Sequence, residues 1–373
     1  MKMPVLLFAD RLPPLTGGME MHARYFIEHF QGHAHYPLLG VVTRDEAQRD
    51  CLLVGAKRVP QDLRTIVRSL AAEPAIVFFN SGRWIEDIVA LRAALPSALF
   101  VYRTGGNEIL KASLDRHTIA VHDDRQRYWV DRINGCVDVL ITNSAFTEER
   151  LESIGVRRER FVRCVGGVNV AALRTQEHRP DRPGPPVIFC AARFVPYKNH
   201  GLLLDAFAAL MRQGIGFRLR LAGDGPLLDD AQVQARRLGL GSCVEFLGLL
   251  TNEQVCELMV DAEAYVQLSS DFITQVPGGS YVHSEGMGRS ILEALSCGTY
   301  VIAARSGALP EIVTPDRGML VDLGLPDAVA DAIAPMLRSP PTRPEPHDFY
   351  SWERYFARYE RCWEEAYAVP RGH

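Results

Sequence analysis

Short apolar runs alternate with helix-like segments along almost the whole chain, and this alternation limits the fold more than any other feature. The N-terminal runs, rich in Val, Ile, Leu and Phe, lie at 5–9, 37–43, 75–80, 98–103 and 137–143. Segments with helical spacing lie between them, as at 20–30 and 84–95. Buried parallel strands are near-continuous apolar runs joined by helices. The pattern therefore predicts an α/β fold, with helices on both faces of a parallel sheet.

The chain is long enough for two such domains. Its 373 residues exceed the roughly 250 to 300 at which a single hydrophobic core stops growing. The alternation breaks at the proline-rich stretch 174–186 and restarts with a strand-like run at 187–194. We predict an N-terminal domain at 1–172, a linker at 173–186 and a C-terminal domain at 187–345. Two Rossmann-like domains facing across a cleft would bind ligands at the carboxyl ends of their strands.

Composition excludes several classes of protein. The net charge of −4 and the 23% of charged residues do not suit a basic surface that coats nucleic acid. Eight single cysteines without a C-x-x-C pair fit neither a zinc site nor a disulfide framework. The apolar run at the N-terminus stops at Asp10, too early for a signal-peptide core or a membrane span. We expect a cytoplasmic protein, and a peripheral contact with the inner face of the membrane stays open.

The stretch "SEGMGRSILEALSCG" at 284–298 combines a strand end, a glycine-bracketed turn and a short helix. A helix N-terminus offers unpaired N–H groups and a partial positive charge, and Gly286 and Gly288 let an anion approach the backbone. A phosphate is expected there. The predicted donor-binding residues of this segment are Gly286, Met287, Gly288, Arg289, Ser290 and Glu293.

The charged residues near these strand ends predict the chemistry of the ligand. Ionised carboxylates only accept hydrogen bonds, so Glu285 and Glu293 suit sugar hydroxyls. Arg193 and Lys198 precede the next helix and suit phosphate oxygens. Lysine occurs at only four positions in this arginine-rich chain. Together the residues predict a nucleotide sugar, and the Gly17–Gly18 turn of the N-terminal domain is expected to bind the same diphosphate.

Seven ordered motifs carry a resemblance to a known family: "PPLTGGME", "ITNSAFTEERLESIGV", "GGVN", "ARFVPYKNHGLLLDAF", "LAGDGPL", "VEFLG" and "EGMGRSILEALSCGTYVIA". They resemble the GT-B retaining glycosyltransferases of family 4, the glycosyl transferases group 1. The resemblance implies a hexosyltransferase-type enzyme with Glu285 near the donor sugar and Glu293 on the ribose hydroxyls. It also implies that Arg193 and Lys198 hold the diphosphate, which makes Glu285, Arg193 and Lys198 the predicted catalytic set.

The same resemblance implies a closing helix, within 346–373, that crosses back to the N-terminal domain. It also implies catalysis without metal or other cofactor, and the sequence contains no D-x-D motif. The chain departs from similar enzymes at two places. "VYRTGGNEI" stands where relatives often place a histidine, and the connection at 269–284 is longer than usual. We interpret that connection as a lid or an acceptor-specificity loop. The acceptor-side candidates are Asn80, Arg103, Asn107 and Glu108.

The expected function is transfer of a sugar from a UDP- or GDP-sugar to a hydroxyl of a saccharide, lipid-linked or small-molecule acceptor. Such reactions serve bacterial glycan and polysaccharide biosynthesis, lipopolysaccharide assembly and metabolite glycosylation. One alternative is a nucleotide-sugar epimerase of the same fold, and another is an inactive nucleotide-sugar-binding subunit. A dehydrogenase is disfavoured because no strand is followed by G-x-G-x-x-G. The base, sugar, acceptor, linkage and oligomeric state are left open.

Overall fold

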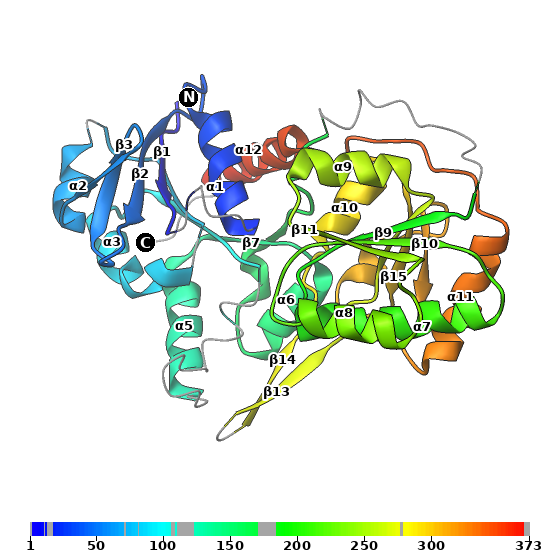
Figure 1. Cartoon of the computed structure of the whole chain (residues 1–373). Coiled ribbons are helices and arrows are strands. Elements are labelled where there is room, and N and C mark those ends of the chain that lie inside the picture. The colour runs from blue at the N-terminus through cyan, green and yellow to red at the C-terminus, as the bar shows by residue number, and fades with distance from the viewer. Residues whose placement is uncertain are drawn as a thin grey trace. The chain divides into compact units, whose positions relative to one another are not determined.

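The computed structural model describes residues 2–10, 12, 18–70, 72–80, 82–105, 109, 123–170, 184–276 and 279–368. Gly17, Asn107 and Glu108 lie outside the described residues. The chain forms two compact units. Unit 1 comprises Met1–Gly167, Val276–Gly279 and Trp352–His373, and unit 2 comprises Val168–Gln275 and Ser280–Ser351. Each unit is described by itself (Figure 1).

Unit 1 contains an eight-stranded sheet in the order β4-β3-β2-β1-β5-β6-β7-β8. Its parallel strands are β1 (Val5–Phe8), β2 (Leu38–Arg44), β5 (Ile76–Phe79), β6 (Leu99–Arg103), β7 (Val139–Thr142) and β8 (Phe161–Arg163). The edge strands β3 (Asp50–Val54) and β4 (Lys57–Pro60) are antiparallel to their neighbours. The parallel strands confirm the predicted α/β pattern. The edge hairpin was not predicted, although Gly55, with φ of +60°, marks its turn.

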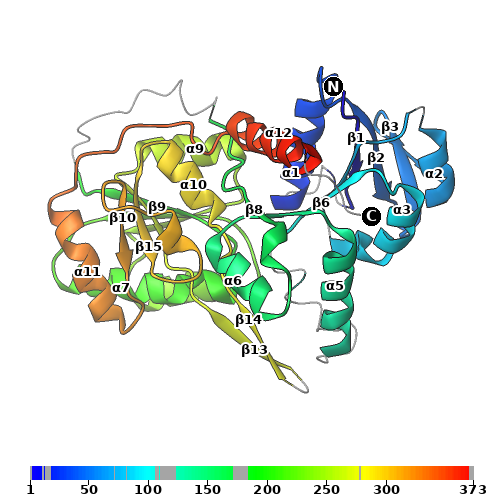
Figure 2. The ribbon, with the colours of Figure 1, turned by 180° about the vertical axis from the view of Figure 1, so that it is seen from behind.

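Helices cover both faces of this sheet, and each face has its own core. One core packs α1 (Gly18–Phe30) and α12 (Trp352–Ala368) on the sheet, and both views show these helices side by side (Figure 2). The opposite core packs α2 (Leu63–Ser69), α3 (Ile88–Ala94) and α5 (Asp123–Cys136). Among its described residues, unit 1 also contains α6 (Ala145–Ser153), η1 (Gly82–Glu86) and η2 (Arg158–Arg160). The helices α1 and α12 are far apart in the sequence and pack together through aromatic side chains. For example, the ring centroids of Phe30 and Trp363 are 5.1 Å apart.

Unit 2 contains a six-stranded sheet in which every pairing is parallel. Its strands are β9 (Val187–Ala191), β10 (Arg218–Ala222), β11 (Val244–Gly248), β12 (Ala264–Gln267), β15 (Tyr300–Ala304) and β16 (Gly318–Val321). Their spatial order, β11-β10-β9-β12-β15-β16, is the 3-2-1-4-5-6 order of a Rossmann fold. The order reverses between β9 and β12. Ligands bind at such a switch point in doubly wound sheets.

The helices of unit 2 also form two layers. On one face α7 (His200–Arg212), α8 (Leu228–Arg237) and α11 (Pro326–Arg338) share the main core. On the other lie α9 (Asn252–Asp261) and α10 (Arg289–Ser296), as both views show. The short helices η3 (Pro196–Lys198) and η4 (Leu309–Glu311) complete the unit. No helix among the described residues is long and apolar enough to cross a membrane.

The segment predicted as a lid or loop at 269–284 contains a β-hairpin. Its strands β13 (Phe272–Val276) and β14 (Gly279–His283) form a separate two-stranded sheet, which stands away from the six-stranded sheet as a narrow ribbon (Figure 1). Phe272 and Ile273 on β13 are 40% and 56% exposed. The hairpin connects the end of β12 to the turn before α10.

Candidate active site

The candidate site of unit 2 lies where the strand order reverses. Arg193 and Lys198 follow β9, and Ser269 follows β12. Glu285 lies in the short connection between the hairpin and α10. Because β9 and β12 are parallel neighbours, the segments that follow them leave the sheet at the same edge. This topology brings Lys198 and Glu285 into direct contact.

Glu285 is the centre of a dense set of hydrogen bonds. Its Oε2 atom forms an ion pair with Lys198 Nζ, and accepts hydrogen bonds from Gln267 Nε2 at 3.1 Å and Ser269 Oγ at 3.3 Å. Its Oε1 atom accepts from the Gly288 N–H at 3.2 Å. The side chains of Lys198 and Glu285 are only 12% and 14% exposed. A buried carboxylate with this many donors is held in one orientation.

The two partners keep each other charged. Burial raises the pKa of the Glu285 carboxyl, but the Lys198 charge and the donors outweigh it, so the pKa lies below its usual value. Burial likewise lowers the pKa of Lys198, but the Glu285 carboxylate outweighs it and raises the pKa. At neutral pH the site therefore holds a carboxylate beside an ammonium group. Such a carboxylate is suited to accept hydrogen bonds from a ligand and is a poor proton acceptor.

Two glycines fix the backbone around Glu285. Gly307 has φ of +56°, and a Cβ there would lie 2.5 Å from the Glu285 carbonyl oxygen. That carbonyl accepts a hydrogen bond from the Ala308 N–H at 3.0 Å. Gly288, at the start of α10, has φ of +73°, and a Cβ there would lie 2.7 Å from Leu309 Cδ2. Both positions need glycine for its conformation, and Gly307 needs it also for space, because its close contact is with backbone.

The motif "LAGDGPL" also has a structural role. A Cβ at Gly223 would lie 2.1 Å from the Ala192 carbonyl oxygen, and one at Gly225 would lie 2.5 Å from that of Phe194. The two glycines therefore let the turn after β10 pack directly on the segment that carries Arg193. Arg193 itself is exposed. The structure places Arg193 on the same connection as Lys198, but only Lys198 contacts Glu285.

Three polar residues of the site were missed by sequence reasoning. Tyr265 Oη lies 2.8 Å from Ser290 Oγ and 3.1 Å from Gln267 Oε1. Ser290 Oγ donates to Gln267 Oε1 at 2.9 Å, and Gln267 Nε2 donates to Ser269 Oγ at 2.9 Å. Tyr265, Gln267 and Ser269 alternate along and just past β12, so the polar period of two in a buried strand was the available signal. They connect the predicted residues Ser290 and Glu285.

The other predicted residues of the turn lie in a separate environment. Glu293, on α10, is 7% exposed, and burial raises the pKa of its carboxyl despite Arg289, whose Nε is 3.5 Å from Glu293 Oε1. Gly286 and Met287 are half-buried between Glu285 and Gly288. The two glutamates thus occupy different surroundings, and their contacts with a ligand stay a prediction.

In unit 1 the acceptor-side candidates Asn80 and Arg103 lie together at the ends of β5 and β6. One Arg103 Nη atom lies 3.4 Å from Asn80 Oδ1, and Arg103 Nε donates to Tyr355 Oη at 3.2 Å. Asn80 Nδ2 donates to the Met19 carbonyl oxygen at 2.9 Å, close to Gly18 at the start of α1. Tyr355 on α12 therefore holds Arg103 in place, a role that sequence reasoning did not assign.

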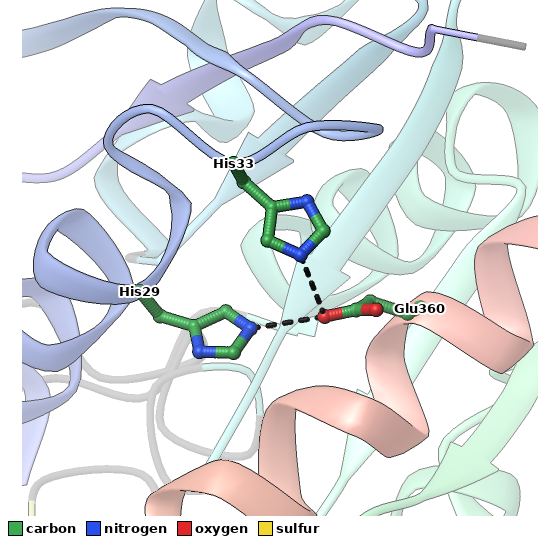
Figure 3. Close-up of side chains that lie close together, drawn as sticks. All are labelled: His29, His33 and Glu360. Atoms are coloured by element: carbon green, nitrogen blue, oxygen red, sulfur yellow. Dashed lines mark hydrogen bonds and ion pairs between the residues drawn. The ribbon is translucent and has the colours of Figure 1, made fainter.

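A second cluster in unit 1 joins α12 to the end of α1. His29 Nε2 and His33 Nε2 lie 2.9 and 3.6 Å from the same Glu360 oxygen, and both rings point toward it (Figure 3). His33 Nδ1 accepts a hydrogen bond from the Tyr36 N–H at 3.1 Å. In neutral His33 this bond leaves the proton on Nε2, the atom that a metal ion would need. We therefore interpret the cluster as a set of hydrogen bonds that holds α12 against the end of α1.

Comparison with known proteins agrees with the fold. Residues 174–350 match the family model described as "Glycosyl transferases group 1". Sucrose-phosphate synthase from Thermosynechococcus elongatus superposes with a TM-score of 0.72 at 18% identity, covering 99% of this chain and 100% of that one. Anabaena HepE in complex with UDP and glucose superposes with a TM-score of 0.67 at 17% identity, covering 97% and 100%. At such identities these structures show a shared fold.

The sequence has a relative along most of its length. It is 27% identical over 363 residues to the GDP-mannose-dependent alpha-(1-6)-phosphatidylinositol monomannoside mannosyltransferase of Mycobacterium tuberculosis, with 89% of each chain covered. Fold, family match and relative point to a two-domain α/β glycosyltransferase of the GT-B type. The match to the group 1 glycosyltransferases spans residues 174–350, which is 177 of the 373 residues, and the relative is named as a mannosyltransferase. The predicted fold class is confirmed, and the predicted family and enzyme class agree with these comparisons.

Proposed function

We propose that the enzyme transfers a mannosyl residue from GDP-mannose to a hydroxyl of a lipid-linked saccharide, with retention of anomeric configuration and without a metal ion. The relative named for GDP-mannose-dependent transfer supports this choice of donor. The observation that carries the proposal is the buried Lys198–Glu285 pair at the switch point of unit 2. It offers a cation for a diphosphate next to a carboxylate for sugar hydroxyls.

The residues of unit 2 have distinct roles in this proposal. The bond from the anomeric carbon to the diphosphate oxygen breaks, and its electron pair stays on the diphosphate. Lys198, Arg193 and the N–H groups at the start of α10 stabilise that charge. Glu285 accepts hydrogen bonds from the donor sugar, and Glu293 from the ribose. The acceptor oxygen bonds to the anomeric carbon from the side the diphosphate leaves, and its proton passes to the diphosphate.

The proposal has three further parts, which concern the metal, the acceptor and the membrane. The sequence has no D-x-D motif, and Lys198 and Arg193 supply positive charge that a metal ion would otherwise provide. Asn80 and Arg103 are proposed as acceptor contacts in unit 1. A lipid-linked acceptor implies a cytoplasmic enzyme that contacts the membrane surface peripherally.

Thermal unfolding with nucleotides tests the donor. A ligand that binds the folded state stabilises it by RT ln(1 + [L]/Kd), about 2.7 kcal/mol at a concentration of 100 Kd. We expect GDP and GDP-mannose to raise the unfolding temperature more than UDP, ADP or their sugars. If a UDP compound stabilises most, the GDP-mannose assignment is wrong. If no nucleotide stabilises the protein, the site itself is wrongly assigned.

A transfer assay tests the reaction. Purified enzyme with GDP-mannose and a phosphatidylinositol monomannoside should form an α-linked product in the presence of EDTA, as seen in the anomeric proton signals. Glu285→Gln should lower kcat much more than it weakens GDP binding, whereas Lys198→Ala should damage both. A β-linked product would exclude retention, and loss of activity with EDTA would exclude metal independence. An epimerised donor in the absence of acceptor would favour the epimerase alternative.

A further inference from the structure

The two ends of the β13–β14 hairpin lie in unit 2, and both are attached to the turn that carries Lys198. At the β14 end, the His283 ring packs on the Tyr197 ring with centroids 3.9 Å apart and planes inclined by 34°. At the β13 end, the Ser270 N–H donates to the Tyr197 carbonyl oxygen at 2.8 Å. Tyr197 is thus held through its side chain and its backbone. One contact comes from each end of the hairpin, and we call these two ends, residues 269–270 and 283–284, the hairpin roots.

Tyr197 in turn contacts the catalytic lysine. Lys198 Nζ lies 5.4 Å from the centroid of the Tyr197 ring, within the range of a cation–π interaction. Lys198 is the last residue of η3, a helix of one turn. Such a turn has few internal hydrogen bonds and does not hold its own geometry. The next residue, Asn199, has φ of +58°, so the backbone changes direction immediately after Lys198.

The partner of Lys198 also depends on the hairpin. Glu285 follows β14 closely, with only Ser284 between His283 and Glu285. At the other root, Ser269 Oγ donates to Glu285 Oε2 at 3.3 Å. The hairpin therefore sets the position of both members of the ion pair: one by chain connection, the other through Tyr197. A displacement of the hairpin roots must change the distance between Lys198 and Glu285.

We propose that His283 and Tyr197 are positioning residues, and that their ring contact makes the hairpin control the geometry of the Lys198–Glu285 pair. The structural part of this proposal stands on the contacts of unit 2. Its effect on turnover rests on the proposed function. The role requires an aromatic ring at position 283. We therefore expect phenylalanine to substitute for His283 without loss of the contact, and alanine to lose it.

The lysine content of the chain provides a direct test without any activity measurement. Only four lysines are present, so acetylation of Lys198 by an amine-reactive ester can be followed by peptide mass spectrometry with exposed Lys57 as the internal reference. In the wild type, buried and paired Lys198 should react much more slowly than Lys57. His283→Ala should speed its acetylation about tenfold relative to Lys57, as a free-energy loss of about 1.4 kcal/mol gives. His283→Phe should leave the rate near the wild-type value.

Two further variants complete the test. Tyr197→Leu removes the ring from the other side and should accelerate acetylation as His283→Ala does. Ile273→Thr changes an exposed residue of the same hairpin, keeps a β-branched side chain and should change nothing. Thermal unfolding shows whether each variant is folded. Slow acetylation of Lys198 in both His283→Ala and Tyr197→Leu, or fast acetylation in His283→Phe, would overturn the proposal.

Turnover then connects the contact to catalysis. His283→Ala should lower kcat about tenfold and also raise the donor KM, as expected for Lys198→Ala, because the group displaced binds the diphosphate and stabilises the leaving charge. His283→Phe should restore kcat. Normal kcat in His283→Ala would overturn the catalytic part. If the wild-type protein transfers no sugar to any acceptor, the proposed function has failed, and the acetylation rates still decide the positioning role.

Discussion

The Lys198–Glu285 ion pair permits a quantitative prediction. Replacing Glu285 by Gln leaves the buried Lys198 charge without its counterion and places an amide NH₂ among groups that donate hydrogen bonds to the carboxylate. Removing one partner of a buried pair costs about 3 to 5 kcal/mol. Lys198→Met should cost less, because Gln267, Ser269 and the Gly288 N–H still bind the carboxylate. The double variant Lys198→Met/Glu285→Gln should be more stable than Glu285→Gln alone.

The measurement must report on unit 2. All four tryptophans lie in unit 1, so their fluorescence does not follow the site. Hydrogen exchange in peptides from α7 and α10 gives the free energy of opening of this unit directly. We expect a coupling energy of about 2 kcal/mol at neutral pH, within the range of contacting residues. If the two single effects add to within about 0.5 kcal/mol, Lys198 and Glu285 do not interact as the geometry requires.

The same coupling has a defined pH window. The lowered pKa of Glu285 means that its contribution is complete above its usual value of 4.5 and is lost as pH falls through the folded-state value. The raised pKa of Lys198 means that its contribution is complete below 10.5 and is lost as pH rises through the folded-state value. The coupling energy should therefore be constant at neutral pH and shrink in acid and in strong base.

Three other variants test the surroundings of the site and of α12. His200 stacks on Phe194 with centroids 4.0 Å apart, and burial, with a smaller effect of a nearby cation, lowers its pKa from 6.5 to about 4. The free energy of unfolding should therefore fall by about 3 kcal/mol as pH falls from 6.5 to 4, because of His200 alone. His200→Phe should remove this contribution to the pH dependence, as measured by hydrogen exchange at a series of pH values. Gly225→Ala should destabilise unit 2 by more than about 2 kcal/mol in the same assay, since its Cβ would overlap the Phe194 carbonyl; a neutral effect would contradict the close approach. Glu360→Ala should lower the free energy of unfolding of unit 1 by about 1 kcal/mol, as measured by tryptophan fluorescence. Zn²⁺ should not stabilise the wild type. If Zn²⁺ stabilises the wild type but not Glu360→Ala, the His29–His33–Glu360 cluster binds metal.

The alternation of apolar runs was enough to predict the fold class, because strand and helix periods are local properties of the sequence. The two hairpins were missed for a local reason as well. At 51–54 the apolar run is only four residues long, and at 272–283 apolar residues alternate with polar ones, so neither segment has the longer apolar run that marks a buried strand. The turn between β3 and β4 carries a glycine signal at Gly55, which is typical of a hairpin. Strand order depends on tertiary packing and was not visible in the sequence.

The site was predictable only where a residue stands out in its own segment. Lys198 is conspicuous as a rare lysine, and Glu285 stands beside a glycine turn before a helix. Gln267, Ser269 and His283 are ordinary in their segments, and their roles arise from contacts with residues far along the chain. A buried polar network is specified by geometry, which composition and spacing do not contain.

The ion pair also gives a reason to regard this part of unit 2 as a binding site. Replacing a buried ion pair by uncharged residues of similar volume is often neutral or stabilising, so such a pair is weak evidence of a stabilising role. Here it lies at the carboxyl ends of parallel strands, where two glycines and a hairpin are needed to assemble it. If stability were its purpose, the uncharged double variant should be less stable than either single variant. If binding is its purpose, that variant should recover stability and still fail to bind GDP, and this combination distinguishes the two explanations.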